Sequence, residues 1–267
     1  MSHDREPREE DIRRVILEKF HAAPPTIVMV GVSGVGKSTT LNRMFKTNMK
    51  VSHTTAGTLE FQANEVELTP TSGAAKGEPV GLRVIDAPGL GEDLRRDPDY
   101  LRMYDRHLPD GDIILWVVSA RNRALALDQT YLRRFEPFAD RIVVGLSQVD
   151  LIEPMDWPEG SPIPSPTQRT RLDEIVADRT EKLAHAAGRP LPVIPYSAKY
   201  GFNLETLFAA LIDRCPEEKS WMFGALKNFS FRDFLAGPPA ANGRKPRTGP
   251  PAAKATPSLF ARLFGSK

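Results

Sequence analysis

The sequence has few of the features that mark secreted or membrane proteins. Its single cysteine, Cys215, cannot form an internal disulfide, so we expect a reduced, intracellular chain. No apolar run approaches the roughly 18 residues that a bilayer-spanning helix needs. The first residues, MSHDREPREEDIRR, are charged and lack the apolar centre of a secretory signal. These absences predict a cytoplasmic protein.

The composition is that of an ordinary globular protein. Hydrophobic residues make up 40% of the 267-residue chain and charged residues 26%, with a formal net charge of +2. So small a net charge indicates no nucleic-acid partner by itself. Composition and pattern predict four parts: an amphipathic helix in residues 1–24, a main domain in 25–215, a helical aromatic extension in 216–236 and a disordered basic tail in 237–267.

The main domain alternates between strand and helix patterns. The apolar runs 112–119 and 141–146 are typical of strands buried on both faces of a parallel sheet. Further strands are predicted at 26–30, 58–69, 80–86 and 191–196, and helices at 8–22, 37–47, 97–108, 125–135, 167–187 and 203–214. This order predicts an α/β fold with a mainly parallel six-stranded sheet flanked by helices.

A phosphate-binding motif follows the first predicted strand. Gly31–Ser38 (GVSGVGKS) fits G-x-x-x-x-G-K-[ST] between a strand and a helix, which is the context that a P-loop requires. Backbone N–H groups, the lysine charge and the helix N-terminus then converge on phosphate oxygens, and the serine hydroxyl coordinates Mg²⁺. The predicted phosphate-binding residues are Ser33, Gly34, Val35, Gly36, Lys37, Ser38 and Thr39, and Ser38 is also a predicted metal ligand.

Two later segments extend this predicted site. Asp86-Ala-Pro-Gly89 ends a strand, so Asp86 is placed to reach Mg²⁺ through water and Gly89 to offer an N–H group to the γ-phosphate. Thr55, in the polar stretch 53–57, is predicted to close onto the metal when a triphosphate is bound. The alternative for Thr55 is a solvated loop residue.

The end of the strand 141–146 predicts the identity of the base. Asp150 can accept two hydrogen bonds from guanine, and adenine has no matching pair of donors. The later segment Ser197-Ala198-Lys199 can offer the Ala198 N–H group to the guanine oxygen. Together with Gln148, these residues form the predicted guanine site.

The five motifs in this order resemble the Era-like, translation-factor-class P-loop GTPases over residues 25–215. Residues 86–128 are similar to a bacterial subgroup of YfjP-type and immunity-related GTPases. The resemblance implies a G domain that hydrolyses GTP to GDP and phosphate with Mg²⁺. In the family, an Asn or Thr braces the P-loop and a Lys covers the base, whereas this chain has Ser147 and Gln148. Guanine specificity then rests on Asp150 and the Ser-Ala-Lys segment.

The residues that would drive hydrolysis depart from the family pattern. Leu90 occupies the position where many relatives orient water with a glutamine, and Gly34 replaces the asparagine of potassium-dependent relatives. Glu92, Asp93 or a residue from a partner are the candidate substitutes, and no catalytic residue is assigned. A slow switch, with turnover of about 10⁻⁴ to 10⁻² per second, is expected.

The composition of the tail, residues 237–267, is compatible with three roles. Residues 237–267 contain basic residues and no acid, and end in an apolar–basic pattern around Leu259–Phe264. A membrane-surface anchor, a motif that docks into a groove of a partner, and a plain disordered tail all fit this composition.

Two alternative functions remain open: a ribosome- or RNA-associated assembly GTPase, and a P-loop ATPase. The sequence shows no KH-type GXXG unit and no aromatic RNP pattern, so no direct nucleic-acid module is evident. The expected partners are GTP or GDP and an unidentified protein effector.

Overall fold

The computed structural model describes residues 9–45, 62–68, 80–90, 97–216 and 219. The chain divides into two units, Met1–Ala236 and Gly237–Lys267, and the described residues all belong to the first. Thr55, Glu92 and Asp93 lie outside the described residues, as do nearly all of the predicted aromatic extension and the whole basic tail.

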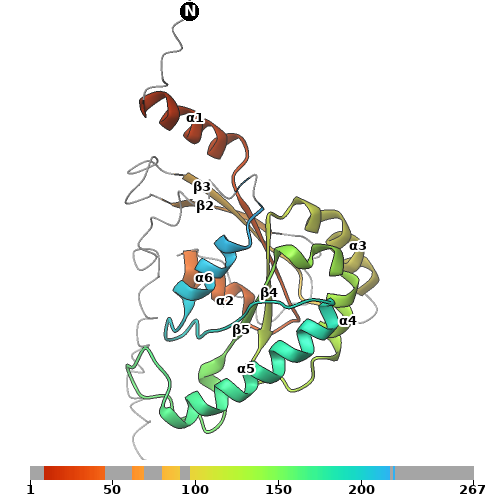
Figure 1. The fold of residues 1–267 in the computed structure, drawn as a ribbon, viewed down its shortest axis with the longest axis vertical. Helices are drawn as coiled ribbons and strands as arrows, with labels where there is room; N and C mark the ends of the chain where they lie inside the picture. Colours follow the sequence, from red (N-terminus) through yellow and green to blue (C-terminus); the bar gives the residue numbers. More distant parts are fainter. Residues whose placement is uncertain (1–8, 46–61, 69–79, 91–96, 217–218, 220–267) are drawn as a thin grey trace, which may run out of the picture. The chain divides into compact units, whose positions relative to one another are not determined.

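A six-stranded sheet forms the centre of this unit, in the order β2-β3-β1-β4-β5-β6 (Figure 1). Five neighbouring strands, β3, β1, β4, β5 and β6, run parallel to one another, and β2 runs antiparallel to β3. The strands are β1 (Thr26–Val30), β2 (Gln62–Leu68), β3 (Val80–Asp86), β4 (Ile113–Ser119), β5 (Ile142–Ser147) and β6 (Val193–Pro195). The prediction of a mainly parallel six-stranded sheet is confirmed.

The helices also lie where the sequence predicts them, with ends that shift by a few residues. They are α1 (Glu9–Ala22), α2 (Lys37–Phe45), α3 (Asp97–His107), α4 (Ala126–Arg134), α5 (Pro166–Ala187) and α6 (Leu204–Asp213). Local chemistry sets the bounds of α5. The Ser165 hydroxyl accepts a hydrogen bond from the Gln168 N–H group at 3.0 Å, and Gly188 ends the helix in a left-handed conformation.

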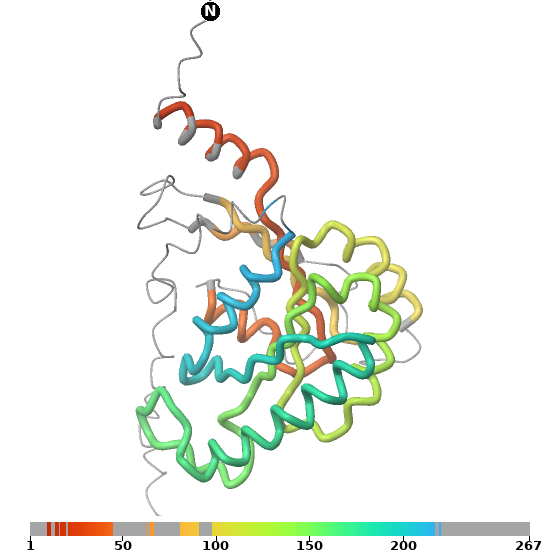
Figure 2. Tube along the Cα trace, in the orientation of Figure 1, coloured from red at the N-terminus to blue at the C-terminus, as the bar shows by residue number. Residues whose placement is uncertain are grey.

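Helices lie on both sides of the sheet (Figure 2), and successive residues of the central strands belong to two different core clusters. Val28 and Trp116 pack in the cluster that includes residues of α3, α4 and α5. Ile27 and Leu115 pack in the cluster that includes residues of α2 and α6. Because both faces of the sheet are covered, every position of β1, β4 and β5 is buried, which accounts for their continuous apolar runs.

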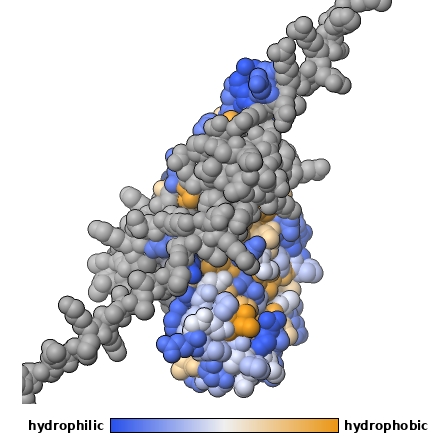
Figure 3. Space-filling model, turned by 90° about the vertical axis from the view of Figure 1, so that its left-hand side faces the viewer, coloured by the Kyte–Doolittle hydropathy of each residue, from blue (hydrophilic) through white to orange (hydrophobic). Residues whose placement is uncertain are grey.

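The described surface is mixed in polarity. On the face shown in Figure 3, hydrophilic residues are interspersed with small apolar patches. The large exposed hydrophobic residues of the described part are Val15, Leu127, Met155 and Ile163. No helix in the described part is both long and apolar enough to cross a membrane.

Candidate functional site

The carboxyl ends of the parallel strands bring the predicted motifs to one edge of the sheet. The P-loop follows β1, Asp86 ends β3, Ser147 ends β5, and the Ser-Ala-Lys segment follows β6. Ligands of open α/β sheets bind at this edge. The predicted site residues that the structure describes therefore lie together at the carboxyl-end edge of the sheet.

The P-loop is wound tightly around the lysine of its motif. Lys37 Nζ donates to the carbonyl oxygens of Gly31 at 3.0 Å and Val32 at 3.4 Å. Gly31 has a positive φ, and a Cβ there would lie 2.4 Å from the Val117 carbonyl oxygen, so no larger residue fits. Within the loop, Ser33, Gly34 and Thr39 are exposed, Gly36, Lys37 and Ser38 are half-buried, and Val35 is buried. The exposed side of the loop is thus available to a ligand.

Ser38 and Asp86 form the candidate metal site. The Ser38 hydroxyl donates to Asp86 Oδ2 at 3.0 Å, while Asp86 Oδ1 is buried and has no hydrogen-bond partner in the described structure. Burial raises the pKa of Asp86, and the positive charge of Lys37 and the Ser38 hydrogen bond oppose that rise. A buried carboxylate oxygen without a donor, beside a hydroxyl, is a set of hard oxygen ligands that suits Mg²⁺. These residues therefore fit the predicted ion.

Gly89 and Leu90 are joined to the P-loop through their backbone. The Leu90 N–H group donates to the Gly31 carbonyl, the Ser33 N–H group donates to the Leu90 carbonyl, and both distances are 3.2 Å. A Cβ at Gly89 would lie 2.9 Å from Ser33 Cα, so this close approach requires glycine. The Leu90 side chain is fully buried in the core rather than directed to the loop. It cannot orient a water molecule, as the sequence predicted.

Ser147 supports the P-loop despite replacing the usual Asn or Thr. Its Oγ lies 2.7 Å from the Val35 carbonyl oxygen and 3.1 Å from that of Val118. Both oxygens are acceptors, and the single hydroxyl proton can be donated to one at a time. The shorter distance joins β5 to the P-loop.

Gln148 is held by two hydrogen bonds of its own. Its Nε2 donates to the Gly34 carbonyl at 3.2 Å, and its Oε1 accepts from the Ser119 hydroxyl at 2.7 Å. Its backbone is left-handed, with φ of 58°. The side chain thus connects the P-loop to the end of β4. The sequence predicted Gln148 as a cover for the base and gave no indication of either bond.

Asp150 is buried and oriented by Ser197. The Ser197 hydroxyl donates to Asp150 Oδ1 at 2.7 Å and accepts from the Tyr200 N–H group at 3.2 Å. Asp150 Oδ2 accepts no hydrogen bond from any described residue. The arrangement leaves one carboxylate oxygen for a ligand and places Ala198 next to the serine that orients it.

An aromatic cluster that the sequence did not predict supports the same segment. The Trp157 and Tyr200 rings are stacked at 5.0 Å and 9°, and Phe202 meets Trp157 edge-on at 5.5 Å. Lys199 Nζ lies 4.7 Å from the centre of the Tyr200 ring on which it rests, and a hydrogen bond to Tyr200 raises the Lys199 pKa. Tyr200, the aromatic residue directly after the Ser-Ala-Lys segment, was the sequence feature from which this stack could have been predicted.

A buried pair of hydroxyls ties β6 to the start of α2. Thr40 Oγ1 lies 2.8 Å from the Tyr196 hydroxyl and donates to the Gly36 carbonyl, also at 2.8 Å. Burial raises the pKa of Tyr196 well above its usual value. Neither residue was predicted to matter, because the contact spans distant parts of the chain.

Comparisons with known proteins find similar sequences over much of the chain. Residues 26–146 match the family model described as "50S ribosome-binding GTPase". The chain is 28% identical to the uncharacterised protein YfjP of Escherichia coli K12 over 224 residues, covering 79% of this chain and 69% of that protein. It is 24% identical to GTPase Era of Aquifex aeolicus over 195 residues, covering 72% of this chain and 56% of Era.

Solved structures show the same fold. Aquifex aeolicus Era bound to GDP·AlF4⁻ aligns with a TM-score of 0.50 at 21% identity, covering 72% of this chain and 57% of that one. The bacterial dynamin GTPase LeoA from ETEC aligns with a TM-score of 0.53 at 12% identity, covering 82% and 44%. The chain thus spans 44–69% of the length of these three proteins. The P-loop, the family match over residues 26–146 and this architecture together show that the chain has the G-domain fold of P-loop GTPases.

Proposed function

We propose that this protein binds GTP with Mg²⁺, hydrolyses it slowly to GDP and phosphate, and acts as a nucleotide-dependent switch. The observation that carries the proposal is the Asp150 carboxylate, which Ser197 holds by one oxygen at the sheet edge that also bears the P-loop. Oδ2 of Asp150 is open and Oδ1 keeps a second lone pair, so the carboxylate can accept from both the N1–H and the amino donors of guanine. Adenine cannot supply that pair of donors.

The phosphates would lie on the P-loop. The backbone N–H groups of residues 33–39 and of Gly89 would donate to phosphate oxygens, aided by the N-terminus of α2. Lys37, which here donates to loop carbonyls at 3.0 and 3.4 Å, would turn its charge toward the β- and γ-phosphates. The lysine is thus already held at the loop on which the phosphates would lie.

Mg²⁺ would be held by the Ser38 hydroxyl and by Asp86, the latter through water. The open Oδ1 of Asp86 supports this assignment. Thr55, outside the described residues, is proposed as a further ligand in the GTP-bound form. When bound, the ion would neutralise charge on the β- and γ-phosphates.

The guanine would lie between Gln148 and the Ser-Ala-Lys segment. Ala198 would donate its N–H group to the guanine oxygen, and Ser197 would keep Asp150 oriented. Since the Gln148 amide is bonded to Gly34 and Ser119, only its aliphatic stem is available to pack on the base. Lys199 would contribute its stem from the opposite segment, held over Tyr200.

Hydrolysis would be slow because two familiar ways of activating it are missing. Leu90 is buried in the core, and Gly34 offers no side chain to recruit potassium. Turnover without a partner is expected at about 10⁻⁴ to 10⁻² per second. Glu92, Asp93 or a residue of a partner protein would supply the missing group.

Nucleotide competition tests the proposal. We expect the wild type to prefer GTP over ATP by several orders of magnitude, and Asp150→Asn to prefer xanthosine triphosphate, since its amide matches the altered base. Asp173→Asn on the exposed face of α5 removes the same charge elsewhere and serves as the control. Equal competition by ATP and GTP for the wild type would refute guanine specificity.

A second candidate function is assembly of the ribosome, which the description of the matched family model favours. It predicts that the protein cosediments with ribosomal subunits in one nucleotide state and is released in the other. Cosedimentation with anionic vesicles, with and without residues 237–267, tests the proposed tail anchor in the same format. Binding to neither would leave a protein effector as the partner.

A further inference from the structure

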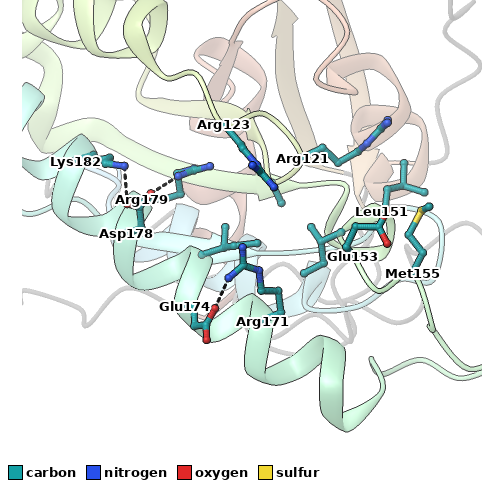
Figure 4. A pocket seen from close by; sticks show the side chains of 13 residues that line it. Arg121, Arg123, Leu151, Glu153, Met155, Arg171, Glu174, Asp178, Arg179 and Lys182 are labelled. Atoms are coloured by element: carbon teal, nitrogen blue, oxygen red, sulfur yellow. Dashed lines mark hydrogen bonds and ion pairs between the residues drawn. The ribbon is translucent and has the colours of Figure 1, made fainter.

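A cavity lies beside the sheet edge that bears the candidate nucleotide site. It has a volume of about 600 Å³ and opens between the β4–α4 connection, the segment after Asp150, and α5 (Figure 4). The connection contributes Arg121 and Arg123, and α5 contributes Arg171, Arg179 and Lys182. No residue of this cavity belongs to the candidate nucleotide site.

The lining carries more positive than negative charge. Five basic and three acidic residues give a local excess of two positive charges, which equals the formal net charge of the whole chain. Arg171 pairs with Glu174, and Asp178 is shared by Arg179 and Lys182. Arg121 and Arg123 form no ion pair with the described residues. The β4–α4 connection therefore carries two positive charges without an ion pair. In this lining α5 carries one more positive charge than it has acids, while Glu153 is the one lining acid that forms no ion pair with the described residues.

Two of the arginines border the cavity from different elements. In Figure 4 the Arg123 side chain, from the β4–α4 connection, and the Arg171 side chain, from α5, lie across the cavity from each other. Arg179, which is 6% exposed, closes the back by donating to the Asn122 carbonyl at 2.8 Å, and its Nε has no partner in the described structure. Like charges across a cavity from each other repel unless an anion lies between them. The cavity thus has an excess of donors over acceptors.

The apolar and acidic residues of the lining distinguish between two classes of anionic ligand, a phosphate-rich polymer and an acidic peptide. Ile152 and Ile175 provide apolar surface, and Met155 is 58% exposed at the rim. A phosphate-rich polymer would bring closely spaced negative charges against Glu153 and Glu174 as well as the arginines. A peptide can place one carboxylate between the arginines and an apolar side chain on the isoleucines.

We propose that this cavity binds an acidic segment of a protein partner. A Glu or Asp side chain would lie between Arg123 and Arg171, and a neighbouring apolar side chain would pack on Ile175 and Met155. The proposal concerns a surface separate from the nucleotide site. Loss of nucleotide binding and loss of peptide binding can therefore be told apart.

The test uses a random 12-residue peptide library displayed on phage and selected on the full-length protein with GDP present. We expect selected peptides to be enriched in Asp or Glu next to apolar residues. In fluorescence polarisation, the labelled peptides should bind about tenfold more weakly to Arg123→Glu/Arg171→Glu, and about threefold more weakly to the milder Arg123→Gln/Arg171→Gln. Binding should also weaken as salt rises.

Arg133→Glu, an exposed charge reversal on α4 outside the cavity, is the matched control and should leave peptide affinity unchanged. Retained GDP binding shows that each variant is folded. The proposal is overturned if the library yields no binder, if the binders lack acidic residues, or if they bind the cavity variants as well as the wild type. It is also overturned if the variants instead lose binding to a uridine 12-mer or to phosphatidylserine vesicles while the peptides still bind.

Discussion

Asp86 shows how one buried side chain can serve stability and binding in opposite ways. Its Oδ2 is bonded to Ser38, its Oδ1 has no partner among the described residues, and burial raises its pKa above the ordinary 3.8. The charged form is therefore costly in the protein alone and useful once a cation is present.

A pH series tests this double role. Because the folded pKa is raised, the protonated side chain contributes stability that is present below pH 3.8 and is lost as the pH rises through the folded pKa. Mg²⁺ should enhance nucleotide affinity least at low pH, where the carboxyl is protonated, and the enhancement should grow as the pH rises through the folded pKa. Asp86→Asn should reduce the Mg²⁺ enhancement at pH 7 about tenfold or more. A Mg²⁺ enhancement equal to that of the wild type in this variant would exclude Asp86 from the metal site.

Trp157 supports the segment of the candidate guanine site that follows β6. Its stacking on Tyr200 supports the segment that bears Ala198, and such aromatic pairs contribute about 0.5–1.5 kcal/mol. We expect Trp157→Ala to speed release of a fluorescent GDP by about two- to tenfold in stopped-flow measurements, and Trp157→Phe to retain most of the wild-type rate. Met155→Ala, an exposed neighbour, is the control. Equal release rates for Trp157→Ala and the control would argue against a supporting role.

At the scale of elements, β5 holds the P-loop through one hydroxyl. We expect Ser147→Ala to cost about 1–3 kcal/mol in the free energy of unfolding, because the buried Val35 carbonyl loses its donor at 2.7 Å. Nucleotide affinity should fall with it, and Ser147→Thr should preserve both. Urea unfolding and GDP titration measure the two effects. An alanine variant as stable as the wild type would show that the brace is dispensable.

The contact between β4 and α4 is a separate structural feature. Trp116 Nε1 donates to Asp128 Oδ1 at 3.0 Å in the core, and burial raises the pKa of Asp128. We expect Asp128→Ala to destabilise the protein by about 1–3 kcal/mol, since a buried indole N–H group is left unpaired. GDP affinity of the folded protein should not change. A double-mutant cycle with Trp116→Phe checks the coupling, and an additive result would rule out an energetic link.

For the whole molecule, the division of the chain after Ala236 leads to a prediction about truncation. A chain of residues 1–236 should fold with the same melting temperature and bind GDP with the same affinity as the full chain. Its effector or vesicle binding should change if the tail has either proposed role. Thermal melting and GDP titration provide the measurement. A truncated chain that fails to bind GDP would place part of the tail in the nucleotide domain.

The strands, the helices and the phosphate motif could be predicted because their signals are local. Continuous apolar runs indicate strands covered on both faces, and Gly31–Ser38 carries its own backbone geometry. The sequence also placed Asp86 correctly at the end of a strand, whereas Asp150 lies three residues beyond β5, in a short 3-10 helix (Val149–Leu151). It did not reveal the Gln148 bonds or the Trp157 stack, since side chains from separate segments make those contacts.

By itself, the sequence determined the order of elements and the edge of the sheet at which the motifs meet, because periodicity and parallel strand ends follow from local chemistry. The tertiary structure alone decided that Ser147 still braces the P-loop, since its acceptor lies 112 residues earlier in the chain. It alone directed Leu90 into the core and set Arg123 opposite Arg171. Packing between distant segments determines which side chains meet, and no local pattern carries that information.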